Sequence, residues 1–96
     1  MDVRVHEFIV QSEYAQQELI QISNLASSFV SQIIITYTDP NDNEHVIDVK
    51  SLLGMILQPI HAGTRIRLST RGKDELEALE TLIDCFSRVP GLEAEH

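Results

Sequence analysis

The segment GTRIRLSTRGKDELEALETLIDCFSRV (63–89) carries the clearest structural pattern in the sequence. In its first part, residues 64–70, apolar and polar side chains alternate, and a period of two is typical of a half-buried strand. Residues 73–89 instead carry apolar side chains every three or four positions, which predicts an amphipathic helix. The apolar stripe of this helix consists of Leu76, Leu79, Leu82, Ile83 and Phe86. Acidic residues crowd its first turns, and Pro90 and Gly91 predict its end.

The N-terminal third of the chain predicts one strand followed by one helix. Residues 3–10 (VRVHEFIV) alternate as a strand does, whereas residues 16–30 have apolar side chains at helical spacing. The helical stripe consists of Leu19, Ile22, Leu25 or Ala26, and Phe29. Ser12 and Glu13 precede this stripe and supply the signals expected at the start of a helix.

The middle of the chain predicts a hairpin and a short helix. Residues 33–38 (IIITYT) are rich in β-branched side chains, and residues 45–49 (HVIDV) read as the returning strand. The connection 39–44 (DPNDNE) consists of turn-forming residues throughout. Residues 51–56 (SLLGMI) can form one or two helical turns, which Pro59 would stop.

These elements predict an α+β fold with two layers. A chain of 96 residues, of which 43% are hydrophobic, suits a single domain over residues 1–96. The order is strand, helix, strand, strand, short helix, strand, helix. We therefore expect a four-stranded antiparallel sheet that is covered on one face by the helices near 16–30 and 74–88.

The charge of the chain restricts its partners. The formal net charge is −8, which repels nucleic acid and anionic lipid and favours a protein partner with a basic face. No apolar run approaches the roughly 20 residues of a membrane span, so we expect a cytoplasmic protein without membrane contact. The single cysteine, Cys85, fits a reducing compartment and is expected to pack as a small hydrophobic residue.

Three stretches resemble the HPr family, the histidine-containing phosphocarriers of the bacterial sugar phosphotransferase system. They are ASSF (26–29), VKSLLGMI (49–56) and GTRIRLSTRGKDELEALETL (63–82), and the resemblance covers about residues 3–89. It implies an HPr-like open-faced sandwich. The hairpin around 39–44 looks several residues longer than in typical members, which a surface hairpin tolerates.

The same resemblance indicates that the phosphate-carrying histidine is missing. The family carries phosphate on a histidine within Gly-x-His-Ala-Arg-Pro, before the first helix. The matching stretch here is EYAQQE (13–18), with Ala15 at the histidine, Gln17 at the arginine and Glu18 at the proline. Phosphoryl transfer needs an imidazole nucleophile and a cation that holds the phosphate. The resemblance therefore implies that this place holds no catalytic residue. It also implies that the protein is neither a phosphocarrier nor an enzyme.

The remaining histidines suggest no replacement. His6 and His45 are expected to be ordinary strand residues, and His96 a terminal one. His61 lies in the loop that is near the active centre in the family, but no matching cation accompanies it. No pair among these histidines and Cys85 has metal-ligand spacing, so we expect neither a metal nor a cofactor.

Ser51 has two open interpretations. It can simply cap the short helix, which stabilises such a helix by about 1 kcal/mol. In the family, the matching serine is phosphorylated by HPr kinase/phosphorylase as a regulatory switch, and phosphate is favoured at a helix N-terminus. Lys50, Leu52, Leu53 and Ile56 would then form the partner-binding surface around it.

Two functions follow from the resemblance. The chain is most similar to the catabolite-repression HPr-like branch, which lacks the histidine and acts as a corepressor with a catabolite control repressor. The alternative is a diverged interaction module that keeps the HPr fold and is not phosphorylated. The partner, the oligomeric state and the roles of the 39–44 hairpin and His61 are left open by the sequence.

Overall fold

The computed structural model describes residues 3–58 and 60–94, with side chains described up to residue 87. Its elements in chain order are β1 (Val3–Ile9), α1 (Gln16–Ala26), β2 (Gln32–Thr38), β3 (Glu44–Asp48), α2 (Leu52–Leu57), β4 (Arg65–Arg71) and α3 (Glu75–Ala94). Each strand lies within one residue of its predicted bounds. Pro59, the predicted stop of the short helix, and His96 lie outside the described residues.

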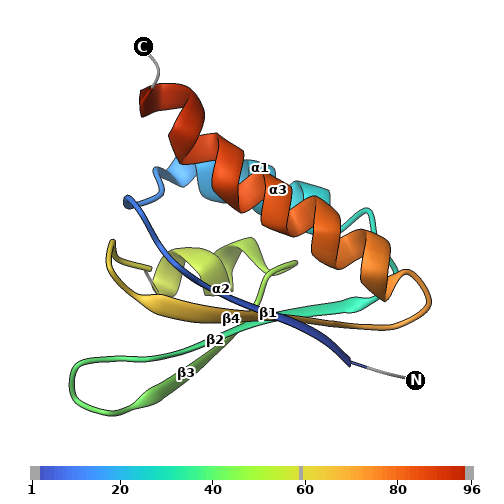
Figure 1. Cartoon of the computed structure of the whole chain (residues 1–96), viewed down its shortest axis with the longest axis horizontal. Coiled ribbons are helices and arrows are strands. Elements are labelled where there is room, and N and C mark those ends of the chain that lie inside the picture. The colour runs from blue at the N-terminus through green and yellow to red at the C-terminus, as the bar shows by residue number, and fades with distance from the viewer. Residues whose placement is uncertain (1–2, 59, 95–96) are drawn as a thin grey trace.

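The four strands form one antiparallel sheet in the order β1-β4-β2-β3. In the register of the central strands, Ile35 of β2 lies opposite Leu68 of β4 and Ile47 of β3. The helices lie on one face of the sheet and leave the other face open (Figure 1). The predicted two-layer α+β fold is therefore confirmed.

The core lies between the sheet and the two longer helices. The inward-facing side chains of β2 and β4 are buried because their apolar residues recur at every second position. They meet the predicted stripes of α1 and α3, which include Ile22, Leu82 and Phe86, all at most 2% exposed. Burying each such side chain contributes roughly 1.5–3 kcal/mol to folding.

The first helix is shorter than the sequence predicts. α1 ends at Ala26 instead of residue 30, because the hydroxyls of Ser27 and Ser28 donate to backbone carbonyls in the preceding turn. Such local side-chain bonds compete with continuation of the helix. Phe29 is still buried, as its place in the predicted stripe requires, but it reaches the core from the loop.

The last helix is longer than predicted, because α3 continues through Pro90 to Ala94. Proline lacks the N–H that would otherwise bond to the carbonyl of Phe86 one turn earlier. The hydroxyl of Tyr14 donates to this carbonyl at 3.3 Å, and the two aromatic rings pack edge to face. Burial, with the Glu18 carboxylate nearby, raises the pKa of Tyr14 to about 12, so the hydroxyl keeps its proton. The predicted end at Pro90 is wrong because a distant side chain replaces the lost donor.

A close contact fixes the turn between β4 and α3. Gly72 has a φ of +151°, and a Cβ atom there would lie 2.6 Å from the Cα of Ser31. Asp74 then accepts hydrogen bonds from the amides of Val30 and Ser31 at 3.0 and 2.9 Å. The turn before α3 is thereby joined to the loop before β2, and only glycine fits at position 72.

We expect Gly72→Ala to destabilise the fold by roughly 3 kcal/mol, because backbone strain and overlap with Ser31 add together. Gly63→Ala is the matched control, since Gly63 also has a positive φ (+88°) but no atom within 4 Å of the added Cβ. Strain alone should cost about 1 kcal/mol there. Urea unfolding of both variants measures the difference. Equal losses would show that the contact with Ser31 does not restrict position 72.

Candidate functional site

The carboxylate of Glu18 caps the N-terminus of α1. Ala15 is the N-cap residue, and the Oε1 atom of Glu18 accepts its amide N–H at 2.6 Å. Glu18 is only 7% exposed. The predicted start signals, Ser12 and Glu13, do not cap this helix, because Glu18 reaches back from inside the first turn and takes that role. The methyl group of Ala15 offers no nucleophile.

The loop that contains His61 does approach this helix entrance. Nδ1 of His61 lies 3.5 Å from the Oε2 atom of Glu13, and both side chains are about two-thirds exposed. The neighbour of His61 is therefore an anion. Gln17, in the first turn of α1, is exposed and uncharged. An incoming phosphate would meet carboxylates here rather than a cation.

Ser51 is the N-cap residue of α2. Its backbone is extended, its side chain is exposed, and its Oγ atom accepts the amide N–H of Gly54 at 3.1 Å. Because α2 is anchored by the fully buried Met55, its opposite side faces solvent. Leu53 is 66% exposed and Ile56 36% exposed, whereas Leu52 is half-buried. The serine and its apolar neighbours are accessible, as modification or docking requires; both roles stay predictions.

Two residues beside this surface have contacts or exposure that the sequence did not reveal. Lys50, expected to contact a partner, donates from Nζ to the backbone carbonyl of Phe29 at 2.7 Å and is half-buried. Its position ties α2 to the loop after α1. Leu57 was not assigned to the surface, yet it is 68% exposed at the end of α2. It is the last apolar residue of the run that contains Leu53 and Ile56. Its place in this run could have predicted that it belongs to the same surface.

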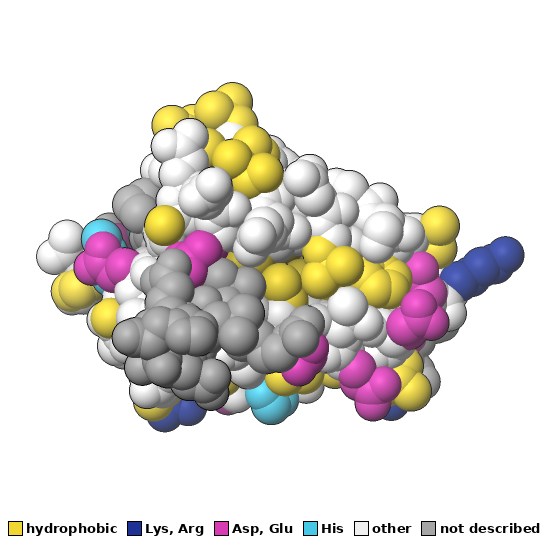
Figure 2. All heavy atoms as spheres, turned by 90° about the horizontal axis from the view of Figure 1, so that it is seen from above, with side chains coloured by type: hydrophobic (Ala, Val, Ile, Leu, Met, Phe, Trp, Pro, Cys, Tyr) yellow, Lys and Arg dark blue, Asp and Glu magenta, His cyan; other side chains and the backbone are white. Residues whose placement is uncertain are grey.

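The helical side of the molecule presents hydrophobic and acidic side chains. Among the side chains that the structure describes, those of Lys and Arg lie at the margins in the view from above the helices (Figure 2). With a net charge of −8 for the whole chain, this side is electrostatically suited to a basic partner.

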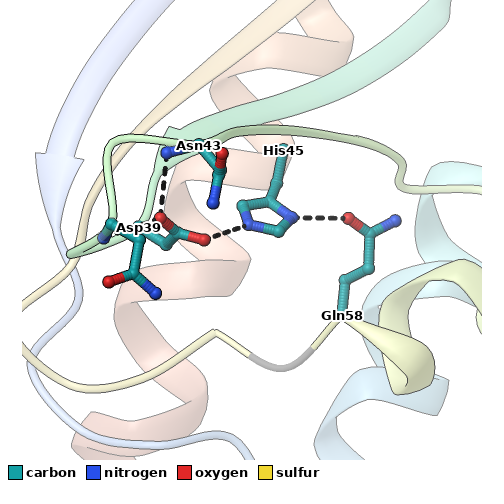
Figure 3. Close-up of polar contacts among 5 residues, drawn as sticks. Asp39, Asn43, His45 and Gln58 are labelled. Atoms are coloured by element: carbon teal, nitrogen blue, oxygen red, sulfur yellow. Dashed lines mark hydrogen bonds and ion pairs between the residues drawn. The ribbon is translucent and has the colours of Figure 1, made fainter.

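A second polar cluster, which the sequence did not reveal, lies at the hairpin (Figure 3). Nε2 of His45 lies 2.8 Å from Oδ2 of Asp39, and Nδ1 of His45 lies 3.2 Å from Oε1 of Gln58. The other carboxylate oxygen of Asp39 accepts the amides of Asn41 and Asn43, both at 2.9 Å. The cluster joins the hairpin turn to Gln58, the C-cap residue of α2. We call it the hairpin clasp.

His45 is therefore more than the ordinary strand residue that was predicted. Its ring stacks on Tyr37, its partner across the β2–β3 ladder, with centroids 4.9 Å apart. The hydrogen bond to Asp39 raises the pKa of His45 above its ordinary value, and the same bond lowers the pKa of Asp39. Asp39 and His45, two ionisable residues on either side of a turn, could have suggested their bond from the sequence. The bond to Gln58 could not be predicted in this way, because it depends on tertiary structure.

The rest of the described chain adds no metal site or membrane span. Across residues 3–58 and 60–94, no three His, Cys, Asp or Glu side chains are grouped so that they could hold a metal ion. None of the described helices is long and apolar enough to cross a membrane. Cys85 is 8% exposed on α3, where it packs in the core.

The hairpin clasp should depend on pH. A raised pKa means that the stabilisation from His45 is complete below its ordinary pKa of 6.5 and is lost as the pH rises through the raised value. The stabilisation from Asp39 is complete above 3.8 and is lost as the pH falls through the lowered value. NMR titration of the His45 ring should give a pKa above 6.5, and Asp39→Asn should lower it. Glu13→Gln, which removes the carboxylate beside His61, is the control and should leave it unchanged. An unaltered His45 pKa in Asp39→Asn would contradict the assignment.

Known protein families and structures include several that are similar to this chain. A family model described as the PTS HPr component phosphorylation site matches residues 19–88, so the match begins just after Ala15–Glu18. Phosphocarrier protein HPr of Cupriavidus necator is 32% identical over 63 residues, which make up 66% of this chain. The alignment spans 65% of the length of that relative.

Two solved structures share the fold. The phosphocarrier protein HPr from Bacillus anthracis superposes with a TM-score of 0.74 at 22% identity, over 88% of this chain and 98% of that one. CRH, the catabolite repression containing protein of Bacillus subtilis, gives a TM-score of 0.62 at 22% identity, over 81% and 84% of the two chains. Because the family model matches well over half of the sequence, the chain belongs to the HPr family.

Proposed function

We propose that this protein is a cytoplasmic regulatory member of the HPr family that does not carry phosphate on a histidine. The proposal rests on one contrast between two helix N-termini. At α1 the nucleophile's position is occupied by Ala15, whereas at α2 Ser51 remains exposed as the N-cap residue. The sequence resemblance supports the proposal, because by that resemblance the regulatory position of the family is kept and its carrier position is replaced.

Phosphocarrier chemistry at α1 is disfavoured for two reasons. The methyl group of Ala15 has no lone pair that could attack a phosphoryl group. The Glu18 carboxylate is bonded at 2.6 Å to the Ala15 amide, so a phosphate approaching this helix end would have to displace it and overcome its charge. The likeness in fold to CRH, a protein named for catabolite repression, suits a regulatory role.

Phosphorylation at Ser51 would change the surface of α2. A phosphoserine adds roughly 1.5 to 2 negative charges and three strong acceptor oxygens. These charges would lie beside Leu53 and Ile56, whose side chains are exposed. A partner would then need apolar side chains together with Arg or Lys. We propose HPr kinase/phosphorylase and a catabolite control repressor as partners of this kind.

One observation favours a second candidate, an interaction module without phosphorylation. The Oγ atom of Ser51 already accepts the amide of Gly54, so the serine has a structural task of its own. Docking over Leu53 and Ile56 would then require no modification. Salt dependence separates the candidates, because apolar docking responds weakly to ionic strength whereas phosphate recognition weakens strongly.

We expect that phosphoenolpyruvate and enzyme I of the phosphotransferase system leave the protein unlabelled, because position 15 holds no nucleophile. An HPr with its histidine, incubated in parallel, is the positive control. Ala15→His alone should restore little labelling, since Gln17 and Glu18 leave the phosphate without a cation. Acid-labile phosphate on any histidine of the wild-type protein, His61 above all, would refute the proposal.

The second test concerns Ser51. Purified HPr kinase/phosphorylase with ATP should add one phosphate to the wild-type protein and none to Ser51→Ala, as measured by mass spectrometry. Ser51→Ala should lose only about 1 kcal/mol of stability as a helix cap. Ser12→Ala changes another exposed serine and should still be phosphorylated. If the wild-type protein stays unmodified and Ser51→Ala binds its partner normally, the interaction module is the correct reading.

A further inference from the structure

A hollow of about 330 Å³ lies between the hairpin, the end of α2 and the loop before β4. Its walls include Tyr37, Pro40, His45, Leu57, Gln58 and His61. Pro40 lines it from the hairpin and Leu57 from the end of α2, and the hairpin clasp joins these two segments. The hollow is separate from Ser51, which lies at the other end of α2.

The hairpin clasp holds the walls of this hollow in place. His45 bridges the hairpin turn and the C-cap of α2 through Asp39 and Gln58, at 2.8 and 3.2 Å (Figure 3). The stacked Tyr37 ring fixes the His45 ring from the side of β2. Because the walls are already positioned, a ligand would lose little free energy in ordering them.

The charges around the hollow indicate what fits there. The hairpin that forms one rim carries Asp39 and Asp42, and Glu13 is paired with His61 on the other side. Among the described side chains that line the hollow there is no Lys or Arg. An apolar cavity with an acidic rim is complementary to an apolar side chain flanked by basic residues.

The hollow is also continuous with the exposed face of α2. Leu57 lines it and is itself 68% exposed, in the same short helix as Leu53 and Ile56. A protein seated on those side chains could place one further side chain in the hollow without leaving the surface.

We propose that this hollow is a second contact site for a basic protein partner, and that it receives one apolar side chain flanked by Arg or Lys. The site extends the α2 surface of the proposed function, on which it rests, toward the hairpin. The hairpin thereby takes part in selecting the partner, which gives the 39–44 segment a role in recognition.

The first test uses a synthetic peptide and is independent of any kinase. A short peptide with one leucine between arginines should shift the NMR signals of Tyr37, His45 and Leu57 at millimolar concentration, and added salt should weaken this effect. A peptide in which glutamates replace the arginines is the matched control and should cause at least tenfold smaller shifts. Equal binding of both peptides, or shifts confined to other surfaces, would overturn the proposal.

The second test measures the phosphorylation of Ser51 by HPr kinase/phosphorylase. Leu57→Ala and Pro40→Ala should each lower kcat/KM by about five- to tenfold, mainly through KM, and Leu57→Met should restore it. Val46→Ala is the control, because Val46 is 55% exposed on the same hairpin but on the opposite face of the sheet. Thermal melts of all variants verify that they are folded.

The outcomes distinguish this proposal from the function on which it rests. If the wild-type protein is phosphorylated but Leu57→Ala and Pro40→Ala stay within twofold of it, the hollow is not a contact site, and the regulatory function stands. If the kinase leaves the wild-type protein unmodified while the arginine peptide occupies the hollow, the phosphorylation proposal fails and the site is supported.

Discussion

The placement of α3 over the sheet depends on the carboxylate of Asp74, which joins two turns that are far apart in the sequence. One of its oxygens accepts bonds from the amide and the hydroxyl of Ser31, and the other accepts the amide of Val30. The bond from the Ser31 hydroxyl lowers the pKa of Asp74, which keeps the acceptor charged and its bonds strong. These bonds can form only because Gly72 lets the two backbones touch. The start of α3 is therefore fixed relative to β2, and Tyr14 holds the same helix further along through the carbonyl of Phe86.

This arrangement explains why the fold could be read from the sequence while the helix ends could not. The periods of two and 3.6 depend on which side chains face the core, and burial enforces them in strands and helices alike. A helix end depends instead on which group satisfies the last amides and carbonyls. In α3 the hydroxyl of Tyr14 bonds to the carbonyl of Phe86, which Pro90 leaves without its usual donor, and the helix continues past the proline. No local pattern near Pro90 reveals this bond. In α1 the group is Glu18, which supplied the N-terminal bond expected from Ser12 or Glu13.

The candidate site shows the same division between local and tertiary information. The capping position of Ser51 and the exposure of Leu53 follow from the sequence, because a helix of six residues can bury only one side, here at Met55. The engagement of Lys50 with the Phe29 carbonyl does not follow, since it requires two loops to meet. The clasp at His45 is hidden for a similar reason. Its two partners come from the turn before it and from the end of α2, and only the packing of α2 beside the hairpin brings all three together.

The two helix N-termini differ in the group that binds each of them, and the proposed function depends on this difference. In α1 the carboxylate that accepts the amide of Ala15 belongs to Glu18, a residue of the same helix. Such an intramolecular carboxylate has no association entropy to lose, so it competes strongly with a free phosphoryl group for the same amide. In α2 the amide of Gly54, three residues after the N-cap, is bound instead by the neutral hydroxyl of Ser51, and Ser51 is exposed. A neutral cap leaves the helix end able to accept negative charge later. Under the proposed function, this difference between a fixed carboxylate at α1 and an exposed hydroxyl at α2 is what would move the response to phosphate from the first helix to the second.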